Sequence, residues 1–313
     1  MLEGKMNVVP LRCVLREGGD VVFVMPFFPH HPFTSYFRDM PWEELGGYLR
    51  NLMLALSHVH SKNIIHRDIK PANFLYDRTR RRYCLIDFGL AQWVDAPEKK
   101  PESVVSLAGP STRPPKLGPA SRQKATRTMC DCFGQRMVCQ LCVNKPLLYA
   151  PRAGTPGFRA PEILLRFTKQ TTALDVWSIG VIILCICSGR YPFFRGTDDC
   201  TALAEIMTLL GSKPMQDLAA KKGKRLVIST LCKAKNLRDV CEGLRGRRKS
   251  QNPSGEEEAP DDDGKKPISS GYPDGLYSLL AKLLTIDPDE RVSSAAAYED
   301  PVISDHPLPP PAS

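Results

Sequence analysis

The stretch His66-Arg67-Asp68-Ile69-Lys70-Pro71-Ala72-Asn73 decides the fold of this 313-residue chain. Its Asp and its Asn stand five residues apart, a spacing typical of a loop that carries catalytic and metal-binding side chains. Asp87-Phe88-Gly89 begins fourteen residues after Asn73, and Ala160-Pro161-Glu162 lies further along. Each short motif is weak by itself. Their order, after a long helical pattern and among short strands, makes coincidence negligible.

The segments around these motifs have the patterns of short strands and amphipathic helices. Residues 11–16 and 20–27 are predicted strands joined by Glu17-Gly18-Gly19, which is a hairpin signal. Apolar residues recur at helical spacing from Pro41 to about Lys62. We further expect short strands at 64–65, 73–76 and 82–86, and helices at 173–188, 198–210 and 274–284.

Composition indicates a globular chain, with 42% hydrophobic and 25% charged residues. No apolar run of signal-peptide length follows Met1. The longest apolar run, residues 176–187, is too short to span a bilayer and is typical of a buried helix. We therefore expect a soluble protein of the cytosol or nucleus with no membrane contact.

The net charge of +9 is concentrated in two stretches. Residues 95–152 carry a net +6 and residues 213–253 a net +9, and an acidic run at 254–266 carries a net −4. Such composition suits insertions that are solvated, flexible or in contact with acidic partners. Few aromatic residues lie among the basic ones, so we expect no direct sequence-specific binding of nucleic acid.

The three motifs resemble those of eukaryotic protein kinases, and the resemblance covers nearly all of a kinase C-terminal lobe. It implies ATP and Mg²⁺ as cofactors and a reaction that depends on positioning and charge neutralisation. In this resemblance Asp68 accepts or orients the proton of the substrate hydroxyl, and Lys70 supplies positive charge. Asn73 and Asp87 would hold Mg²⁺. Lys70 and Gly154-Thr155 are typical of serine/threonine kinases, in which a threonine like Thr155 bonds the catalytic Asp and Lys.

Two further residues, Asp175 and Arg291, resemble residues that stabilise the fold of kinases. Asp175, which opens the Asp-Val-Trp-Ser-Ile-Gly stretch, resembles the buried helix residue that steadies the catalytic loop in kinases. Arg291 resembles the arginine that pairs with the glutamate of the Ala-Pro-Glu motif, here Glu162. We expect the Glu162–Arg291 pair to be structural.

The chain is more closely similar to the cell-division-cycle-seven kinases, the catalytic subunits of the Dbf-four-dependent kinase. The similarity rests on Met25-Pro26-Phe27-Phe28 as a linker, on residues 70–76 and 87–92, and on residues 153–162. It implies a Dbf-four-type regulatory subunit, a nuclear location and a role in DNA replication and the cell cycle. The linker residues, Leu75 and Asp87 are the expected cofactor contacts.

Four cysteines are clustered within thirteen residues: Cys130, Cys132, Cys139 and Cys142. Four thiolates at such spacing suit a structural, tetrahedral Zn²⁺, although free thiols are the alternative because Cys-x-Cys is less typical than Cys-x-x-Cys. A similar zinc-binding knob occurs at this point of the resembled family. Its role would be to order a loop that lacks a core of its own.

Arg152 and Arg159 flank the Thr155 segment, where kinases contact the residue that follows the target serine or threonine. They are either ordinary surface charges or a basic pocket for an acidic or phosphorylated neighbour. The second reading suits the acidic-context substrates of the resembled family, which include the replicative MCM helicase.

The usual phosphate-binding half of a kinase is not found before residue 28. No Gly-x-Gly-x-x-Gly precedes His66, and neither does a strand lysine with a helix glutamate that pairs with it, so the chain is expected to begin at the fourth strand of that lobe. Two hypotheses follow: a working serine/threonine kinase, or a catalytically impaired truncated isoform that acts as a binding module for the regulatory subunit.

The expected fold class is α+β, a protein-kinase-like fold with a mainly helical C-lobe, a two-strand remnant of the N-lobe and two long insertions. The expected segments are the N-lobe remnant and hinge (1–28), the first part of the C-lobe with the catalytic loop (29–92), the activation-segment insertion with the cysteine cluster (93–151), the second part of the C-lobe (152–211), a basic and acidic insertion (212–270), the end of the C-lobe (271–306) and a disordered tail (307–313).

Overall fold

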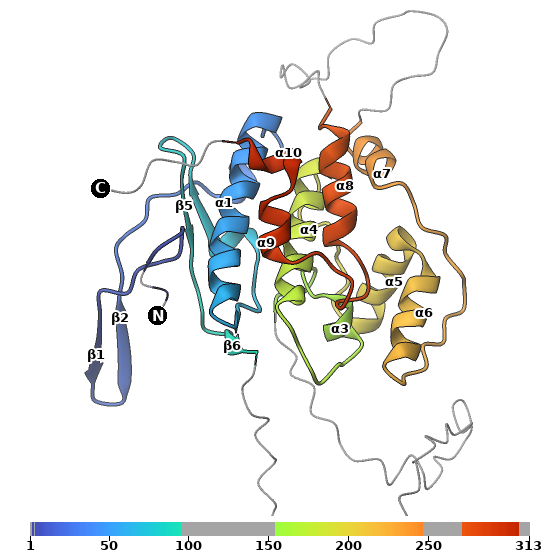
Figure 1. Cartoon of the computed structure of the whole chain (residues 1–313), viewed down its shortest axis with the longest axis horizontal. Coiled ribbons are helices and arrows are strands. Elements are labelled where there is room, and N and C mark those ends of the chain that lie inside the picture. The colour runs from blue at the N-terminus through green and yellow to red at the C-terminus, as the bar shows by residue number, and fades with distance from the viewer. Residues whose placement is uncertain (1, 3, 95–153, 247–270, 307–313) are drawn as a thin grey trace, which may run out of the picture. The chain divides into compact units, whose positions relative to one another are not determined.

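The computed structural model describes residue 2 and residues 4–94, 154–246 and 271–306, and the account below concerns these (Figure 1). Residues 1–96 and 150–313 belong to one compact unit, to which all the elements named here belong. Among the described helices, none is long and apolar enough to cross a membrane.

The first element is an antiparallel hairpin of β1 (Cys13–Glu17) and β2 (Asp20–Val24). Gly18 has φ +58°, the left-handed backbone that a two-residue hairpin turn requires, so the predicted hairpin is confirmed. Most of its side chains are exposed. A parallel bridge between Val8 and Leu85 attaches the chain before the hairpin to the body of the unit.

Helix α1 (Trp42–Ser61) is the first helix of the core and confirms the predicted helical pattern. Pro41 precedes its first turn, which carries Glu43 and Glu44, where negative charge favours the helix N-terminus. Leucines at three- and four-residue spacing form its buried face: Leu45, Leu49, Leu52 and Leu56.

Two short antiparallel ladders follow α1 and frame two loops. Strand β3 (Ile64–Ile65) pairs with β6 (Gln92–Trp93), and β4 (Phe74–Asp77) pairs with β5 (Arg82–Leu85). The 66–73 loop therefore lies between β3 and β4, and the 86–91 loop between β5 and β6. The pairing brings the two loops, which are about twenty residues apart in the chain, to the same end of the small sheets.

Helix α4 (Ala173–Ser188) is buried along its whole length and ends at Gly189, which has φ +66°. An apolar helix of this kind can only be stable if other elements cover it all round. In Figure 1 it lies in the middle of the helical part, and α8 (Asp274–Leu283) packs directly on it. Around it the chain forms α3 (Pro161–Leu164), α5 (Asp199–Leu210), α9 (Ser294–Tyr298) and α10 (Pro301–Ser304).

The range 212–270 is only partly a solvated insertion, because its first half folds onto the core. It forms α6 (Ser212–Lys221) and α7 (Leu237–Leu244), and α7 packs against α4 and α8. Met215 and Cys241 are fully buried. The charge of this range does not exclude folding, because most of its described basic residues occupy exposed positions while sparse apolar residues face inward. The acidic run lies outside the described residues.

A buried ion pair joins the segment after Thr155 to the end of the chain. Arg291 Nη1 lies 2.8 Å from Glu162 Oε1, and both side chains are almost fully buried. The guanidinium also donates to the carbonyls of Ala173 and Thr285 and lies over the ring of Trp177. The structure thus contains the pair that the motif comparison anticipates. Because both charged side chains are buried, loss of either one leaves the other without its partner ion.

We expect Arg291→Ala to lower the free energy of unfolding by about 3–5 kcal/mol, since it leaves the Glu162 carboxylate buried and uncompensated. The matched control is Lys213→Ala, which removes an exposed pair with Asp217 on α6 and should cost no more than about 1 kcal/mol. Urea unfolding followed by circular dichroism measures both. Equal losses in the two variants would contradict the structural role of Arg291.

Candidate functional site

The 66–73 loop is held by a single buried carboxylate on α4. Asp175 accepts hydrogen bonds from the backbone N–H of His66 (2.8 Å) and of Arg67 (2.7 Å). Arg67 has φ +71°, a left-handed conformation that is strained for a side-chain-bearing residue. The two bonds to Asp175 therefore compensate for a local backbone cost and fix the direction in which the loop presents Asp68.

His66 connects this loop to the second loop. Its Nε2 lies 2.9 Å from the carbonyl oxygen of Ile86, and its ring packs on Phe88 at 4.8 Å between centroids. Burial lowers the pKa of His66, which favours the neutral ring, while the nearby carboxylate of Asp175 acts in the opposite direction. A neutral, buried imidazole suits a structural link between the two loops.

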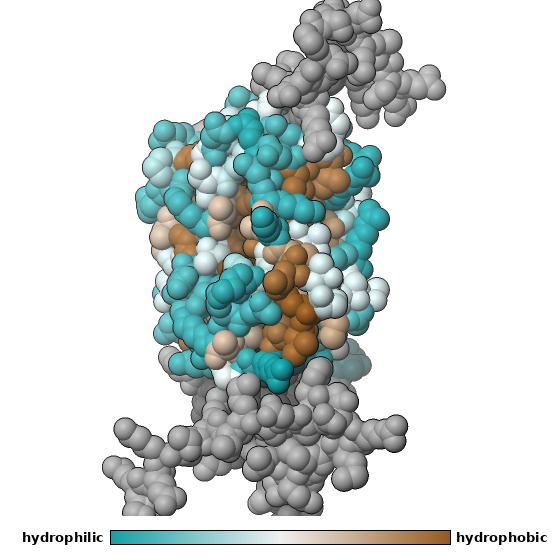
Figure 2. Space-filling view, turned by 90° about the vertical axis from the view of Figure 1, so that its right-hand side faces the viewer, coloured by the Kyte–Doolittle hydropathy of each residue, from teal (hydrophilic) through white to brown (hydrophobic). Residues whose placement is uncertain are grey.

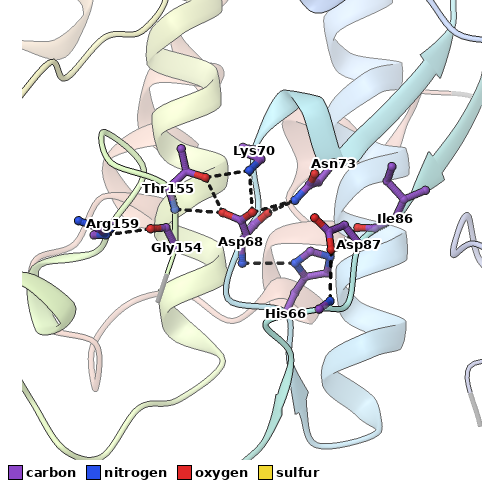
Figure 3. A network of polar contacts seen from close by, with 10 residues as sticks. His66, Asp68, Lys70, Asn73, Ile86, Asp87, Gly154, Thr155 and Arg159 are labelled. Carbon is purple, nitrogen blue, oxygen red and sulfur yellow. Dashed lines mark hydrogen bonds and ion pairs between the residues drawn. The ribbon is translucent and has the colours of Figure 1, made fainter. Parts of the chain in front are cut away.

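Asp68 is the centre of a polar network from three segments of the chain (Figure 3). Lys70 Nζ donates to Asp68 Oδ2 at 2.7 Å, and Thr155 donates to Asp68 Oδ1 through its hydroxyl at 2.7 Å and its N–H at 3.0 Å. Lys70 also donates to Thr155 Oγ1 at 2.9 Å. Asn73 Nδ2 donates to both the carbonyl and the carboxylate of Asp68. All four predicted catalytic residues therefore lie together.

The charge state of Asp68 follows from these contacts. Burial by itself raises the pKa of Asp68, but the hydrogen bonds from Lys70 and Thr155 outweigh it and hold the pKa below its ordinary value. The carboxylate is consequently ionised at neutral pH. An ionised carboxylate that is fixed by donors on one side can accept a hydrogen bond from a hydroxyl that approaches on the other.

Asn73 and Asp87 lie beside each other, on the side of Asp68 that faces away from Thr155 (Figure 3). The amide nitrogen of Asn73 is used by Asp68, while its Oδ1 accepts no hydrogen bond within the described part of the chain. Asp87 is exposed, has φ +65°, and accepts one bond from the N–H of Gly89 at 3.2 Å. Two oxygen donors with unused lone pairs on adjacent loops fit a hard divalent cation such as Mg²⁺.

The predicted cofactor contacts of the linker lie at the surface. Met25 is 50% and Phe27 89% exposed, and Phe28 lies beneath the guanidinium of Arg82 at 5.5 Å. The N–H of His31 donates to the carbonyl of Tyr76, so the chain that follows the linker runs alongside β4, the strand that carries Leu75. Pro26 lies within the same exposed linker. Adenine binding by these residues stays a prediction.

Arg159 lies next to the Asp68 network but is already engaged. Its Nε donates to the carbonyl of Gly154 at 2.9 Å, and its Nη1 lies 3.9 Å from Asp199, which also pairs with Arg166. The bond to Gly154 supports the backbone next to Thr155. Arg152 and the four clustered cysteines, Cys130, Cys132, Cys139 and Cys142, lie outside the described residues.

Sequence analysis missed His60, in the last turn of α1. Its Nε2 lies 2.9 Å from Asp175 Oδ2 and its Nδ1 lies 2.8 Å from Ser294 Oγ on α9. His60 thus joins the carboxylate that holds the 66–73 loop to a distant helix. The sequence carries no distinctive signal for this contact, because α1 contains other polar residues such as Asn51 and His58, and none of them reveals a partner 115 residues away.

Comparison with known proteins agrees with the resemblance of the motifs to those of protein kinases. The protein kinase domain family matches residues 1–115 and 129–303 of the chain. The chain is 30% identical to the "Cell division cycle 7-related protein kinase" of Mus musculus, over 94% of the chain and 79% of that protein. It is 31% identical to a "non-specific serine/threonine protein kinase" of Drosophila melanogaster, over 96% and 60%. The "Cell cycle protein kinase spo4" of Schizosaccharomyces pombe is 34% identical, over 95% and 66%. The chain thus spans less than two thirds of the last two relatives.

We expect Thr155→Val to raise the pKa of Asp68, because the variant removes the hydroxyl that stabilises the charged form of this carboxylate. Thr155→Ser keeps the hydroxyl and should leave the pKa near that of the unaltered protein. An NMR titration of the Asp68 carboxyl carbon measures both. The same pKa in the Val and Ser variants would show that the hydroxyl has no electrostatic role.

Proposed function

Because this chain belongs to the Cdc7 family of serine/threonine protein kinases, we propose that it transfers the γ-phosphoryl group of ATP to serine and threonine hydroxyls of proteins. The observation that supports this best is the Asp68 carboxylate, which is ionised and fixed by Lys70, Thr155 and Asn73. These residues orient a hydroxyl and place one positive charge beside it, as phosphoryl transfer requires.

Each side chain of the site has a separate role in this reaction, which follows from its position. Asp68 accepts the hydrogen bond of the attacking hydroxyl and takes up its proton as the new oxygen–phosphorus bond forms, while the bond between the γ-phosphorus and the β–γ bridging oxygen of ATP breaks and ADP leaves. Lys70 Nζ, held at 2.7 Å from Asp68, balances negative charge on the transferring group. Asn73 and Asp87 would hold Mg²⁺, which supplies neutralisation of phosphate charge when bound.

The proposed substrates are proteins whose target residue has acidic neighbours, and among them subunits of the MCM helicase. Arg159, which lies beside Gly154 and Thr155, supports this choice because it brings positive charge to the segment that precedes the Ala-Pro-Glu motif. We also propose a Dbf-four-type regulatory subunit as partner, a role in DNA replication, and a nuclear location. The proposed substrates, partner, role and location rest on family membership and on the sequence motifs.

A second candidate function is favoured by the β1–β2 hairpin. Leu15, Val21 and Phe23 are each more than half exposed, so the hairpin presents apolar side chains to a neighbour. A two-stranded hairpin is marginal by itself and gains stability when another surface covers it. The chain would then act as a binding module for the regulatory subunit, with little turnover of its own.

A further proposal concerns the cysteine cluster, Cys130, Cys132, Cys139 and Cys142, which we propose to bind one structural Zn²⁺. The support is the spacing of four thiols within thirteen residues. Metal analysis of the purified protein should find about one equivalent of zinc, and exchange of the four cysteines for serine should remove it. Less than about half an equivalent would contradict the proposal.

We expect the chain, mixed with the regulatory subunit, Mg²⁺ and ATP, to phosphorylate a peptide from an acidic MCM tail. Asp68→Asn should reduce kcat by at least about a hundredfold, since the variant cannot take up the hydroxyl proton. The control is Asp217→Asn on the exposed face of α6, which should keep the original rate. A peptide with lysines in place of its acidic residues should be a poorer substrate.

The same assay separates the two candidate functions. Binding of the regulatory subunit with no phosphoryl transfer above the Asp68→Asn level would contradict the kinase proposal and support the binding module. Transfer that Asp68→Asn leaves unaltered would contradict the role of the network.

A further inference from the structure

The segment between α6 and α7 exposes apolar side chains on the face of the molecule shown in Figure 2. Val227 is 52% and Leu231 75% exposed, while Leu226 and Ile228 are partly buried against the core. This alternation is that of an extended chain, in which successive side chains point to opposite sides. Figure 2 shows an apolar band on this face between hydrophilic regions.

The backbone of this segment has unused hydrogen-bonding groups. The bonds from Lys224 to Ala219 and from Ser212 to Cys232 anchor the ends of the segment, and the carbonyl of Leu226 accepts a hydrogen bond from Gln216 Nε2 at 3.5 Å. Within the described residues, no backbone–backbone hydrogen bond involves residues 227–231, so the middle of the segment can still pair with another chain. Such an edge can accept a further extended chain by strand addition.

A groove lies between this segment and α5. It has a volume of about 390 Å³ and is lined on the helix side by Leu203, Ala204 and Met207 and on the other side by Leu226 and Ile228. We call it the α5 groove. Its lining contains no charged residue. Apolar side chains from an added strand would fit into it, in the manner of pockets that give an extended peptide its register.

Positive charge is concentrated in the stretch of sequence that borders the groove. Residues 221–235 contain six lysines and arginines and no acidic residue. Lys221 and Lys222 pair with Asp287 and Asp289, whereas Lys233 and Lys235 are exposed and pair with no carboxylate in the part of the chain that the structure describes. Charge complementarity therefore favours an acidic occupant with apolar residues.

Helix α5 also borders the segment next to Thr155. Ala202 and Ile206 line a small cavity with Pro156, Gly157 and Arg159, while Leu203 and Met207 face the α5 groove. The two surfaces are thus separated by one helix, which is about 10 Å across. A protein bound with its target hydroxyl at Asp68 can reach the groove with a short stretch of extended chain.

We propose that the α5 groove binds an extended docking segment of the protein substrate, in which acidic and apolar residues alternate. This inference rests on the proposed kinase function for the identity of the occupant, and on the groove, the unpaired backbone and the lysines for its chemistry. The docking segment would add to the affinity for a substrate without contact with the reacting atoms.

The binding test uses the full chain and a fluorescein-labelled octapeptide, Glu-Val-Glu-Leu-Glu-Val-Glu-Leu, followed by fluorescence anisotropy. We expect saturable binding, weakened at least about tenfold by Leu231→Asp or by the pair Lys233→Glu and Lys235→Glu. The matched control is Leu244→Asp, at an exposed leucine at the end of α7 that does not line the groove, and this variant should bind as the unaltered chain does. Leu231→Ser, a milder change, and the thermal unfolding of each variant show that a loss of binding is local.

Several outcomes would overturn the proposal. Absent binding, or equal binding by Leu231→Asp and Leu244→Asp, excludes the groove as a peptide site. Tighter binding after replacement of Glu256–Glu258 by serine would make the chain's own acidic run the occupant. A dimer in light scattering that Leu231→Asp converts to a monomer would make a second copy the occupant.

A kinetic test then separates this inference from the proposed function. With a target peptide joined to the docking octapeptide, Leu231→Asp should raise KM and leave kcat unaltered, while the target peptide alone should show no change. An equal KM in both proteins contradicts substrate docking. If no peptide is phosphorylated at all, the kinase function fails and the anisotropy result still decides whether the groove binds peptides.

Discussion

The site depends on one buried interaction, the carboxylate of Asp175 with the backbone of the 66–73 loop. Asp175 has no exposed surface and satisfies the N–H groups of His66 and Arg67 while His60 holds it from the other side. A buried carboxylate is costly unless each lone pair finds a donor. Here two of the donors are backbone N–H groups of the loop, those of His66 and Arg67. The stability of α4 and the conformation of the loop are therefore coupled.

The remaining geometry of the site follows from that constraint. Once Arg67 is held in its left-handed conformation, Asp68 is turned toward Thr155, and the Glu162–Arg291 pair keeps the segment of Thr155 against α4. The neutral ring of His66 also positions the loop of Asp87, because its Nε2 is hydrogen-bonded to the carbonyl oxygen of Ile86. The 66–73 loop is therefore hydrogen-bonded directly to α4, and the loop of Asp87 is positioned indirectly, through His66.

Local patterns in the sequence predicted the elements that have strong periodicity, and motifs predicted the residues that meet at Asp68. Helix α4 and the Glu162–Arg291 pair are where the sequence places them. Helices α6 and α7 were not expected, because their few buried residues, such as Met215 and Cys241, stand among many basic ones. The link of His60 to Asp175 and the α5 groove arise only from tertiary packing, which no local pattern records.

We infer that the Asp175 carboxylate holds the loop in the conformation that makes Asp68 competent. The most direct test is amide hydrogen exchange in Asp175→Asn together with its rate of phosphoryl transfer. We predict faster exchange at His66 and Arg67, unaltered protection in the middle of α1, and a lower rate. Unaltered protection at the two loop amides, or an unaltered rate with a loosened loop, would contradict the account.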